Sequence, residues 1–508
     1  MAILNSILSW LMKKRIHQIE LFMKYPHEVQ QDWFLRLVDT ARNTEWGQAF
    51  DYKSIRKIED YKNRVPVQNY ESTKPFIDRL MKGEQNILWP TDIKWFAKSS
   101  GTTAGKSKFI PVSTEAMEEC HFKGGKDLLS MYCNNNPETK IFSGKGLSLG
   151  GSHQINIDSN ESFYGDISAI LLQNLPFWVQ MIRTPELSIA LMDRWEEKID
   201  KMVEATLKEN VTSLSGVPTW TLVLAKQVLK VTGKKNLLEV WPNLELFIHG
   251  AVSFTPYVDQ FQEIIPSSTF NYIDTYNASE GFFGIQDRLG ANDMLLMLDY
   301  GVFYEFMPME EYGKEDPKTI QLDEVELHRN YAMIITTNAG LWRYLIGDTI
   351  RFTSLHPYRI RVTGRTKLFI NAFGEEVIIE NADEAIRIAT EKTDSLVKDY
   401  TVAPVYFSSG ENGAHEWLIE FERAPISLEY FTVVLDNALK SLNSDYEAKR
   451  YKDMALRLPI VRKLPENSFY EWLKSKGKLG GQYKVPRLNN DRELLEEILK
   501  VLHISPMN

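Results

Sequence analysis

The chain has 508 residues, of which 43% are hydrophobic and 25% charged, and its net charge is −9. This length exceeds the roughly 250 to 300 residues at which a single hydrophobic core stops growing, so we expect two or more domains. Charges of both signs are interspersed, which argues against a nucleic-acid-binding surface. No apolar stretch reaches the about 20 residues that a membrane span needs.

The two cysteines, Cys120 and Cys133, are too far apart for a metal half-site and do not suggest a disulfide framework. The apolar N-terminal stretch precedes the first basic residues, which is the reverse of the order in a signal peptide. We therefore expect a soluble cytoplasmic protein with free thiols and no membrane partner.

The pattern of elements predicts an α/β fold. Apolar residues recur at helical spacing from Ile16 to about Ala49. Strand-like runs bounded by turn residues follow at 93–97, 146–149, 244–248, 270–275, 331–336 and 359–363. Helical stretches at 189–208 and 219–231 lie between several of them, and this alternation is typical of parallel or mixed sheets.

After Gly364 the pattern restarts. Short strands are predicted at 368–371, 402–408 and 417–422, with helices at 376–391 and 428–442. These elements form an α+β unit of common domain size. We therefore predict a large domain over residues 1–364 and a smaller α+β domain over residues 365–508.

A segment rich in glycine and hydroxyl groups, Ser99 to Ser107, reads SSGTTAGKS and follows a predicted strand. Glycines let the backbone approach phosphate oxygens, while hydroxyls, N–H groups and lysines donate hydrogen bonds to them. A Walker A loop does not fit, because Gly101 and Gly105 are separated by three residues and that motif requires four. A surface loop without a ligand remains the alternative.

Two later segments could serve the same nucleotide. Residues 275–284 read TYNASEGFFG, in which Tyr276 could stack on a purine and Glu280 could bind Mg²⁺ through its carboxylate. Residues 342–351 read WRYLIGDTIR, in which Asp348 follows Gly347 at a predicted turn and could accept ribose hydroxyl hydrogens. Each segment taken alone has an ordinary structural explanation.

Together, the segments SSGTTAGKSKFIPV, YNASEGFFG and RYLIGD resemble the three nucleotide-binding motifs of the auxin-responsive acyl acid amido synthetases, the Gretchen Hagen family. That family belongs to the adenylate-forming superfamily, which includes firefly luciferase and acyl-CoA synthetases. The resemblance implies a large multi-sheet N-terminal domain of the adenylate-forming type with a smaller α+β C-terminal domain. It also implies ATP and Mg²⁺ as cofactors.

The resemblance carries residue roles to matching positions. The first motif implies phosphate contacts from Ser99, Ser100, Gly101, Thr102, Thr103 and Lys106. The second and third imply that Tyr276 packs on adenine, Ser279 lies by the α-phosphate, Glu280 binds Mg²⁺ and Asp348 binds ribose. The segment FIHGAVSFTP stands where the superfamily has its adenine loop, which makes base neighbours of Gly250, Ala251 and Val252.

Two C-terminal segments complete the resemblance. GRTKLFINAFG, from Gly364, is similar to the superfamily hinge, and its Arg365 matches a phosphate-contacting arginine. Lys367 and Asn371 depart from the hinge pattern, which has an aspartate and a lysine at these two positions. In GGQYKVPRL, Lys484 matches the lysine that bridges the acyl carboxylate and the α-phosphate, so Lys484 is the candidate catalytic residue.

The implied reaction joins a small carboxylic acid to an amine through an acyl-adenylate, and we expect the amine to be an amino acid. Coenzyme A as acceptor and a non-catalytic nucleotide-binding protein are the alternatives. Leu345 stands where plant members carry an arginine, so the acid need not be a plant hormone. The sequence does not indicate the oligomeric state. A weaker hypothesis assigns the acyl pocket to Gly150, Gly151, Val217, Trp220 and Phe254.

Overall fold

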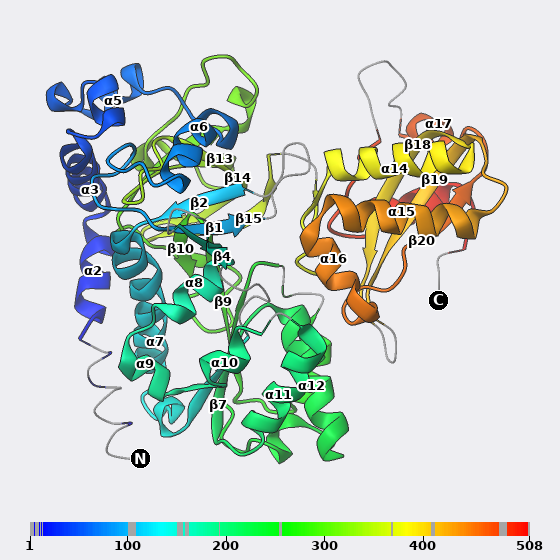
Figure 1. The fold of residues 1–508 in the computed structure, drawn as a ribbon, viewed down its shortest axis with the longest axis horizontal. Coiled ribbons are helices and arrows are strands. Elements are labelled where there is room, and N and C mark those ends of the chain that lie inside the picture. Colours follow the sequence, from blue (N-terminus) through cyan, green and yellow to red (C-terminus); the bar gives the residue numbers. More distant parts are fainter. Residues whose placement is uncertain are drawn as a thin grey trace.

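The computed structural model describes residues 5, 10, 12, 14–99, 108–149, 156–157, 162–192, 194–252, 254, 257–366, 369–407, 412–476 and 485–505. Within these residues the strands form an eleven-stranded sheet and three smaller ones. Figure 1 shows the small C-terminal sheet with its helices beside the larger part of the molecule.

The eleven-stranded sheet has a parallel half and an antiparallel half. The parallel strands, in spatial order, are β9 (Asn271–Ala278), β8 (Leu246–Gly250), β7 (Val211–Ser215), β3 (Lys145–Ser148) and β6 (Arg183–Thr184). The antiparallel strands are β12 (Val302–Pro308), β13 (Asn330–Thr337), β14 (Tyr344–Leu355), β15 (Tyr358–Arg365), β11 (Met294–Leu296) and β10 (Gly281–Ile285). The hairpin between β9 and β10 is where the two halves meet.

A second sheet holds the ends of the predicted phosphate loop. Its strands are β2 (Lys108–Val112), β1 (Trp95–Ser99), β5 (Phe163–Gly165) and β4 (Asn156–Ile157). Because β1 and β2 pair antiparallel, Ser99 lies opposite Lys108. The chain between these two residues therefore starts and ends at neighbouring points.

Helices cover the sheets and bury two large apolar clusters. The helices before and between the strands of the large part are α2 (Ile16–Lys24), α3 (Pro26–Ala41), α4 (Glu45–Ala49), α5 (Ile58–Arg64), α6 (Tyr70–Met81), α7 (Lys123–Asn135), α8 (Ile167–Gln173), α9 (Phe177–Met181), α10 (Leu187–Ala190), α11 (Trp195–Thr206), α12 (Pro218–Thr232) and α13 (Val258–Ile264). One cluster joins α2, α3 and α7 to the antiparallel half, and the other joins α11, α12 and α13 to the opposite face of the parallel half.

The C-terminal part is an α+β unit. Its elements are β16 (Phe369–Ile370), β17 (Val377–Ile378), α14 (Ile379–Thr393), β18 (Leu396–Val405), β19 (Ala414–Arg423), α15 (Leu428–Leu442), α16 (Ser444–Arg450), β20 (Ile460–Leu464), α17 (Ser468–Ser475) and α18 (Glu493–Val501). Figure 1 shows α14 and α15 side by side over β18, β19 and β20. Successive residues of β19 alternate between faces: Trp417 packs with the α14 and α15 side chains, and Leu418 packs with those of α17 and α18.

The segment after β15 connects the two parts through hydrogen bonds. The Tyr257 hydroxyl donates to the Ala372 carbonyl at 2.6 Å, and the Thr219 hydroxyl donates to the Phe373 carbonyl at 3.2 Å. Glu375 and His415 form a fully buried pair at 2.7 Å. The second apolar cluster is continuous across this junction.

The α/β fold with its smaller α+β C-terminal unit is confirmed, and the helix predicted at 428–442 coincides with α15. One predicted helix, however, has the wrong bounds. The helix predicted at 189–208 is divided, because α10 ends at Ala190 and α11 begins at Trp195.

Among the described helices, none has the length and apolar character to cross a bilayer.

The predicted turn at Gly347 and Asp348 is also wrong, because both residues lie inside β14. Gly347 has a φ of +97°, and the pairing register between β13 and β14 shifts at this point. Glycine tolerates this conformation, so the chain forms a bulge and continues as a strand. Asp348 consequently lies opposite Arg365 of β15.

Candidate active site

Asp348 is the centre of a buried polar cluster. Its side chain accepts a hydrogen bond from the Tyr276 hydroxyl at 2.7 Å and another from Arg365 Nε at 3.0 Å. Arg365 also lies 3.4 Å from the carboxylate of Glu376, which follows the predicted hinge segment in the chain. The pKa of Arg365 is raised above its ordinary value, chiefly by Glu376 and also by Asp348. The tertiary structure thus brings together Tyr276, Asp348 and Arg365 from three strands.

This arrangement leaves Asp348 able to accept further hydrogen bonds. A carboxylate offers about four acceptor positions, and the described contacts use two of them. The ring of Tyr276 is only 7% exposed and packs 5.1 Å from Phe283. Stacking of Tyr276 on adenine therefore stays a prediction, while the contact with Asp348 gives Tyr276 a positioning role.

Ser279 and Glu280 form the turn between β9 and β10, directly after the parallel strand β9. Burial raises the pKa of Glu280 to about 7, and Lys108 opposes this shift through its positive charge. Tyr344 lies within electrostatic reach of Glu280, and its buried hydroxyl has no hydrogen-bond partner among the described residues. Lys108 and Tyr344 were missed by the sequence reasoning, although both lie within or beside the quoted motifs.

The predicted adenine loop follows β8. Gly250 is enclosed, because an added Cβ would meet the Thr275 carbonyl oxygen at 2.5 Å. Ala251 has a φ of +69°, and its carbonyl accepts a hydrogen bond of 3.3 Å from the Asn371 amide. Val252 is buried in the second apolar cluster. The loop therefore contacts the predicted hinge segment through Asn371.

The described residues of the predicted acyl pocket all belong to the second apolar cluster. Val217 immediately precedes α12, and Trp220 lies in its first turn. The Phe254 ring stacks on the buried His249 ring at 4.1 Å, which is consistent with a packing role for this histidine. Lys449 of α16 lies over the Trp220 ring at 4.5 Å, so the C-terminal part covers this region.

Several predicted site residues lie outside the described residues: Ser100, Gly101, Thr102, Thr103, Lys106, Gly150, Gly151 and Lys484. Their neighbours are described. Ser99 ends β1. Arg487, three positions after Lys484, contacts Asp383 at 2.6 Å and Asp399 at 3.4 Å. The roles of these residues stay predictions.

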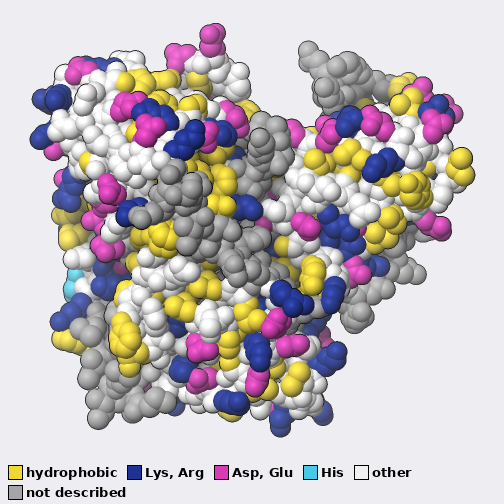
Figure 2. All heavy atoms as spheres, viewed as in Figure 1, with side chains coloured by type: hydrophobic (Ala, Val, Ile, Leu, Met, Phe, Trp, Pro, Cys, Tyr) yellow, Lys and Arg dark blue, Asp and Glu magenta, His cyan; other side chains and the backbone are white. Residues whose placement is uncertain are grey.

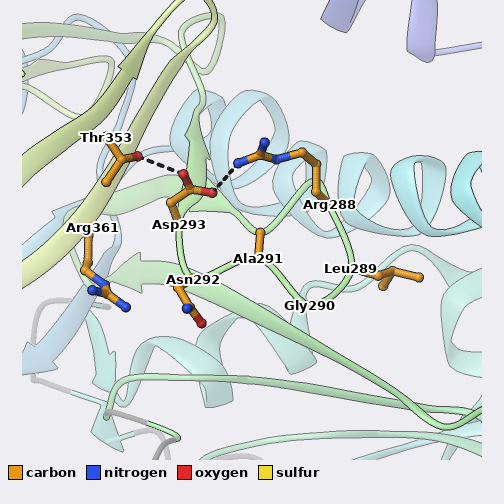
Figure 3. Close-up of a pocket in the computed structure, with 8 residues that line it drawn as sticks. All are labelled: Arg288, Leu289, Gly290, Ala291, Asn292, Asp293, Thr353 and Arg361. Carbon is orange, nitrogen blue, oxygen red and sulfur yellow. Dashed lines mark hydrogen bonds and ion pairs between the residues drawn. The ribbon is translucent and has the colours of Figure 1, made fainter. Parts of the chain in front are cut away.

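The pocket in Figure 3 is lined by none of the predicted site residues. Its wall consists of residues 288–293 together with Thr353 and Arg361. Asp293 accepts hydrogen bonds of 2.8 Å from Arg288 and from Thr353, as the dashed lines show. The pocket therefore lies apart from the residues that the nucleotide motifs suggest.

Comparison with known proteins identifies the family. The GH3 family N-terminal domain matches residues 15–270, which is slightly more than half of the chain. The GH3 family central domain matches residues 295–365 and the GH3 family C-terminal domain matches residues 380–493. The chain belongs to the GH3 family.

Relatives of this GH3 chain span nearly its whole length. It is 24% identical to jasmonoyl–L-amino acid synthetase JAR4 of Nicotiana attenuata, over 93% of this chain and 92% of the relative. Among solved structures, the GH3.15 acyl acid amido synthetase superposes with a TM-score of 0.62 at 18% identity, covering 97% of this chain and 96% of that one. A 2-hydroxyisobutyryl-CoA ligase bound to 2-HIB-AMP and CoA gives 0.57 at 13% identity, covering 94% and 92%. The adenylate-forming fold expected from the motifs is therefore confirmed.

Proposed function

We propose that this GH3 chain activates a carboxylic acid with ATP as an acyl-adenylate and transfers the acyl group to an amino acid, giving an amide. As a GH3 family member the chain is a ligase. The observation that carries the proposal is the match to all three GH3 domains in chain order, from residue 15 to residue 493.

The chemistry explains the need for ATP. A carboxylate is a poor electrophile because its leaving group would be oxide, whereas the acyl-adenylate releases AMP. The carboxylate oxygen forms a bond to the α-phosphorus, and pyrophosphate leaves. Charge on the phosphate oxygens is offset by preorganised donors and cations. In the second step the amine attacks the acyl carbon, and orientation supplies most of the assistance.

The buried cluster supports an ATP site. We assign ribose binding to Asp348, which Tyr276 and Arg365 hold in place by hydrogen bonds. The Ser99–Ser107 segment is the proposed triphosphate-binding loop, and Gly250, Ala251 and Val252 are the proposed base neighbours. Ser99 and Lys108, which flank this segment, lie opposite each other in the β1–β2 pair, so both ends of the segment are at the same end of the hairpin.

We assign Mg²⁺ to Glu280. Within the described residues no group of three or more His, Cys, Asp or Glu side chains could hold a metal ion. Mg²⁺ fits nonetheless, because it commonly binds through one or two carboxylates, substrate phosphates and waters. Burial disfavours the charged form of Glu280, and a nearby cation would favour it. When bound, the ion supplies charge compensation to the phosphates.

We propose that residues 365–508 form a small domain that pivots near Arg365, and that Lys484 on it bridges the acyl carboxylate and the α-phosphate. Arg365 is the last residue of β15, and Asn371 and Phe373 contact the large part. We further propose a cytoplasmic location, which is supported by two buried cysteines that form no disulfide.

The experiment is acid-dependent ATP–pyrophosphate exchange with a panel of carboxylic acids, followed by product analysis with amino acids or coenzyme A as acceptors. We expect exchange without an acceptor, and an amide together with AMP when an amino acid is added. A thioester formed in preference to any amide would contradict the proposed acceptor. Absence of exchange with every acid would contradict the proposed activation step.

One variant tests the proposed catalytic lysine. Lys484→Ala should abolish exchange while ATP binding, measured by calorimetry, stays within about twofold, because its contribution is made in the transition state. The matched control is Lys463→Ala, an exposed lysine on β20 of the same part. Undiminished exchange in Lys484→Ala would remove Lys484 from the mechanism.

A further inference from the structure

Arg183, the first residue of β6, is a buried arginine that contacts no carboxylate of the described residues. Its side chain is 7% exposed, and its Nε and Nη2 atoms have no hydrogen-bond partner among the described residues. Burial alone lowers its pKa, with no acidic neighbour to oppose the shift. An unpaired buried charge is costly, so such a side chain is normally neutralised.

The other buried arginines of the described chain follow that rule. Arg15, Arg343, Arg359 and Arg450 each contact a carboxylate, at 2.9, 3.0, 2.5 and 2.6 Å respectively. Arg183 alone among these five lacks such a contact in the described part. Within the described residues, Arg183 is thus a buried guanidinium that could accept an anion from outside the chain.

The strands beside Arg183 present small polar groups on the same face of the sheet. The register places Arg183 next to Gly146, and Gly146 next to Ser213. Two residues further along, the Ser215 hydroxyl donates to the Ser148 hydroxyl at 3.1 Å. An added Cβ at Gly146 would meet the Ser213 hydroxyl at 3.1 Å, so a larger residue would crowd this row.

This polar row leads to the carboxyl ends of β3 and β7. Ser148 and Ser215 are half-buried there, whereas Arg183 and Ser213 are buried further back along the strands. Ligands of open α/β sheets bind at the carboxyl ends of parallel strands. The row lies on the face of the sheet that Ser213 shares with its paired neighbour Leu246, opposite to Leu147 and Leu214. It runs from the carboxyl ends of β3 and β7 toward the β6 edge, about 10 Å across two strand spacings.

We propose that Arg183 binds a second carboxylate, at the distal end of the acyl acid, so that the preferred substrates are dicarboxylic acids. This inference rests on the proposed function, whose activated acid it specifies. A guanidinium and a carboxylate form two parallel hydrogen bonds, which fix both position and orientation. The part of the acid that links its two carboxyl groups would lie beside the serine hydroxyls, where Gly146 contributes no side chain.

The test compares α,ω-dicarboxylates from succinate to suberate with monocarboxylates of equal chain length, in ATP–pyrophosphate exchange without an acceptor. We expect the kcat/KM ratio of dicarboxylate to monocarboxylate to favour the dicarboxylate at one chain length. Arg183→Met should lower that ratio by about 10- to 100-fold, because a charged hydrogen-bonded contact is lost. Arg183→Lys should retain part of the preference.

The matched control is Arg361→Met, an exposed arginine on β15, which should leave the ratio unchanged. Because Arg183 is unpaired, Arg183→Met should melt at or above the wild-type temperature, and Arg183→Lys provides a second variant if the methionine variant misfolds. An unchanged ratio with active wild-type exchange would overturn the inference and leave the proposed function standing.

If the wild-type chain shows no exchange with any acid, the proposed function fails, and binding then decides the inference. Calorimetry measures the binding of adipate and of hexanoate to the chain in the absence of ATP. Tighter binding of adipate by the wild-type chain, reduced in Arg183→Met, would support the dicarboxylate site. Equal binding of the two acids, or no binding of either, would overturn it.

Discussion

The two halves of the large sheet treat buried cations differently. In the antiparallel half, Arg343 and Arg365 face carboxylates of Glu305, Asp348 and Glu376. Arg183, on the parallel edge, has no such contact in the described chain, and Lys449 lies against α12 over the Trp220 ring. The difference teaches that the antiparallel half uses buried charge to hold its own strands together, whereas the parallel edge holds a buried charge that contacts no carboxylate of the described residues.

Ion pairing fixes the position of a buried cationic side chain, but burying both charges costs free energy. A buried ion pair must offset the desolvation of both groups, so it stabilises little relative to an apolar pair. Loss of one partner, however, leaves the other charge buried and uncompensated. Substitutions at paired and unpaired cations should therefore have opposite consequences for the free energy of unfolding.

The largest effect is expected at Arg343. Arg343 contacts Glu305 at 3.0 Å, and its Nη1 atom donates to the carbonyls of Lys62 and Val65 at 3.0 and 2.6 Å. Arg343→Met leaves Glu305 buried and unpaired, so we expect a loss of about 3 to 5 kcal/mol in urea denaturation. The control Arg329→Met, a half-exposed arginine, should cost about 0 to 1 kcal/mol. Because Arg329 also pairs with a carboxylate, Glu326, equal losses in both variants would show that burial of the ion pair does not set the cost of breaking it.

A smaller effect is expected at Tyr276. The variant Tyr276→Phe removes only the hydrogen bond to Asp348, and a hydrogen bond to a charged group contributes about 1.5 to 3 kcal/mol. The KM for ATP should also rise, because Asp348 loses one of the two contacts that orient it. Tyr272→Phe, on the same strand, is the control. Unchanged stability and KM in Tyr276→Phe would contradict its positioning role.

The smallest effect is a pH dependence at Lys449. Burial lowers its pKa to about 8, against an ordinary value of 10.5, while Asp445, Glu375, Asp166 and Glu376 oppose the shift. Below pH 8 the lysine is charged in both states and burial destabilises the native chain. Between pH 8 and 10.5 the native state releases its proton first, so stability relative to Lys449→Met should rise by about 1 to 2 kcal/mol.

Urea denaturation of the wild-type and Lys449→Met chains at pH 7.5 and pH 9.5 checks this sign. The wild-type chain should gain stability relative to the variant at the higher pH. A constant difference between the two chains would mean that Lys449 has an ordinary pKa and that its environment resembles that of an exposed lysine.

Much of the fold was predictable because periodicity is a local property. Apolar spacing located α15 and most of the strands, and turn residues separated them. The same local reading failed at Gly347, where a positive φ produces a bulge in a continuing strand and not a turn. A glycine is compatible with both outcomes, and only the pairing of β14 with β13 and β15 distinguishes them.

The candidate site shows the same contrast between local sequence patterns and contacts made by the tertiary structure. The sequence by itself indicated the family and the reaction type and predicted the residues of the nucleotide site, because the required groups follow one another at short, recognisable spacings. Only the tertiary structure decided that Tyr276 and Arg365 meet on Asp348, that Asn371 reaches Ala251, and that Arg183 lacks a carboxylate. Whether a charge is paired depends on residues that come together from distant segments, and the sequence does not show how close those residues lie in space.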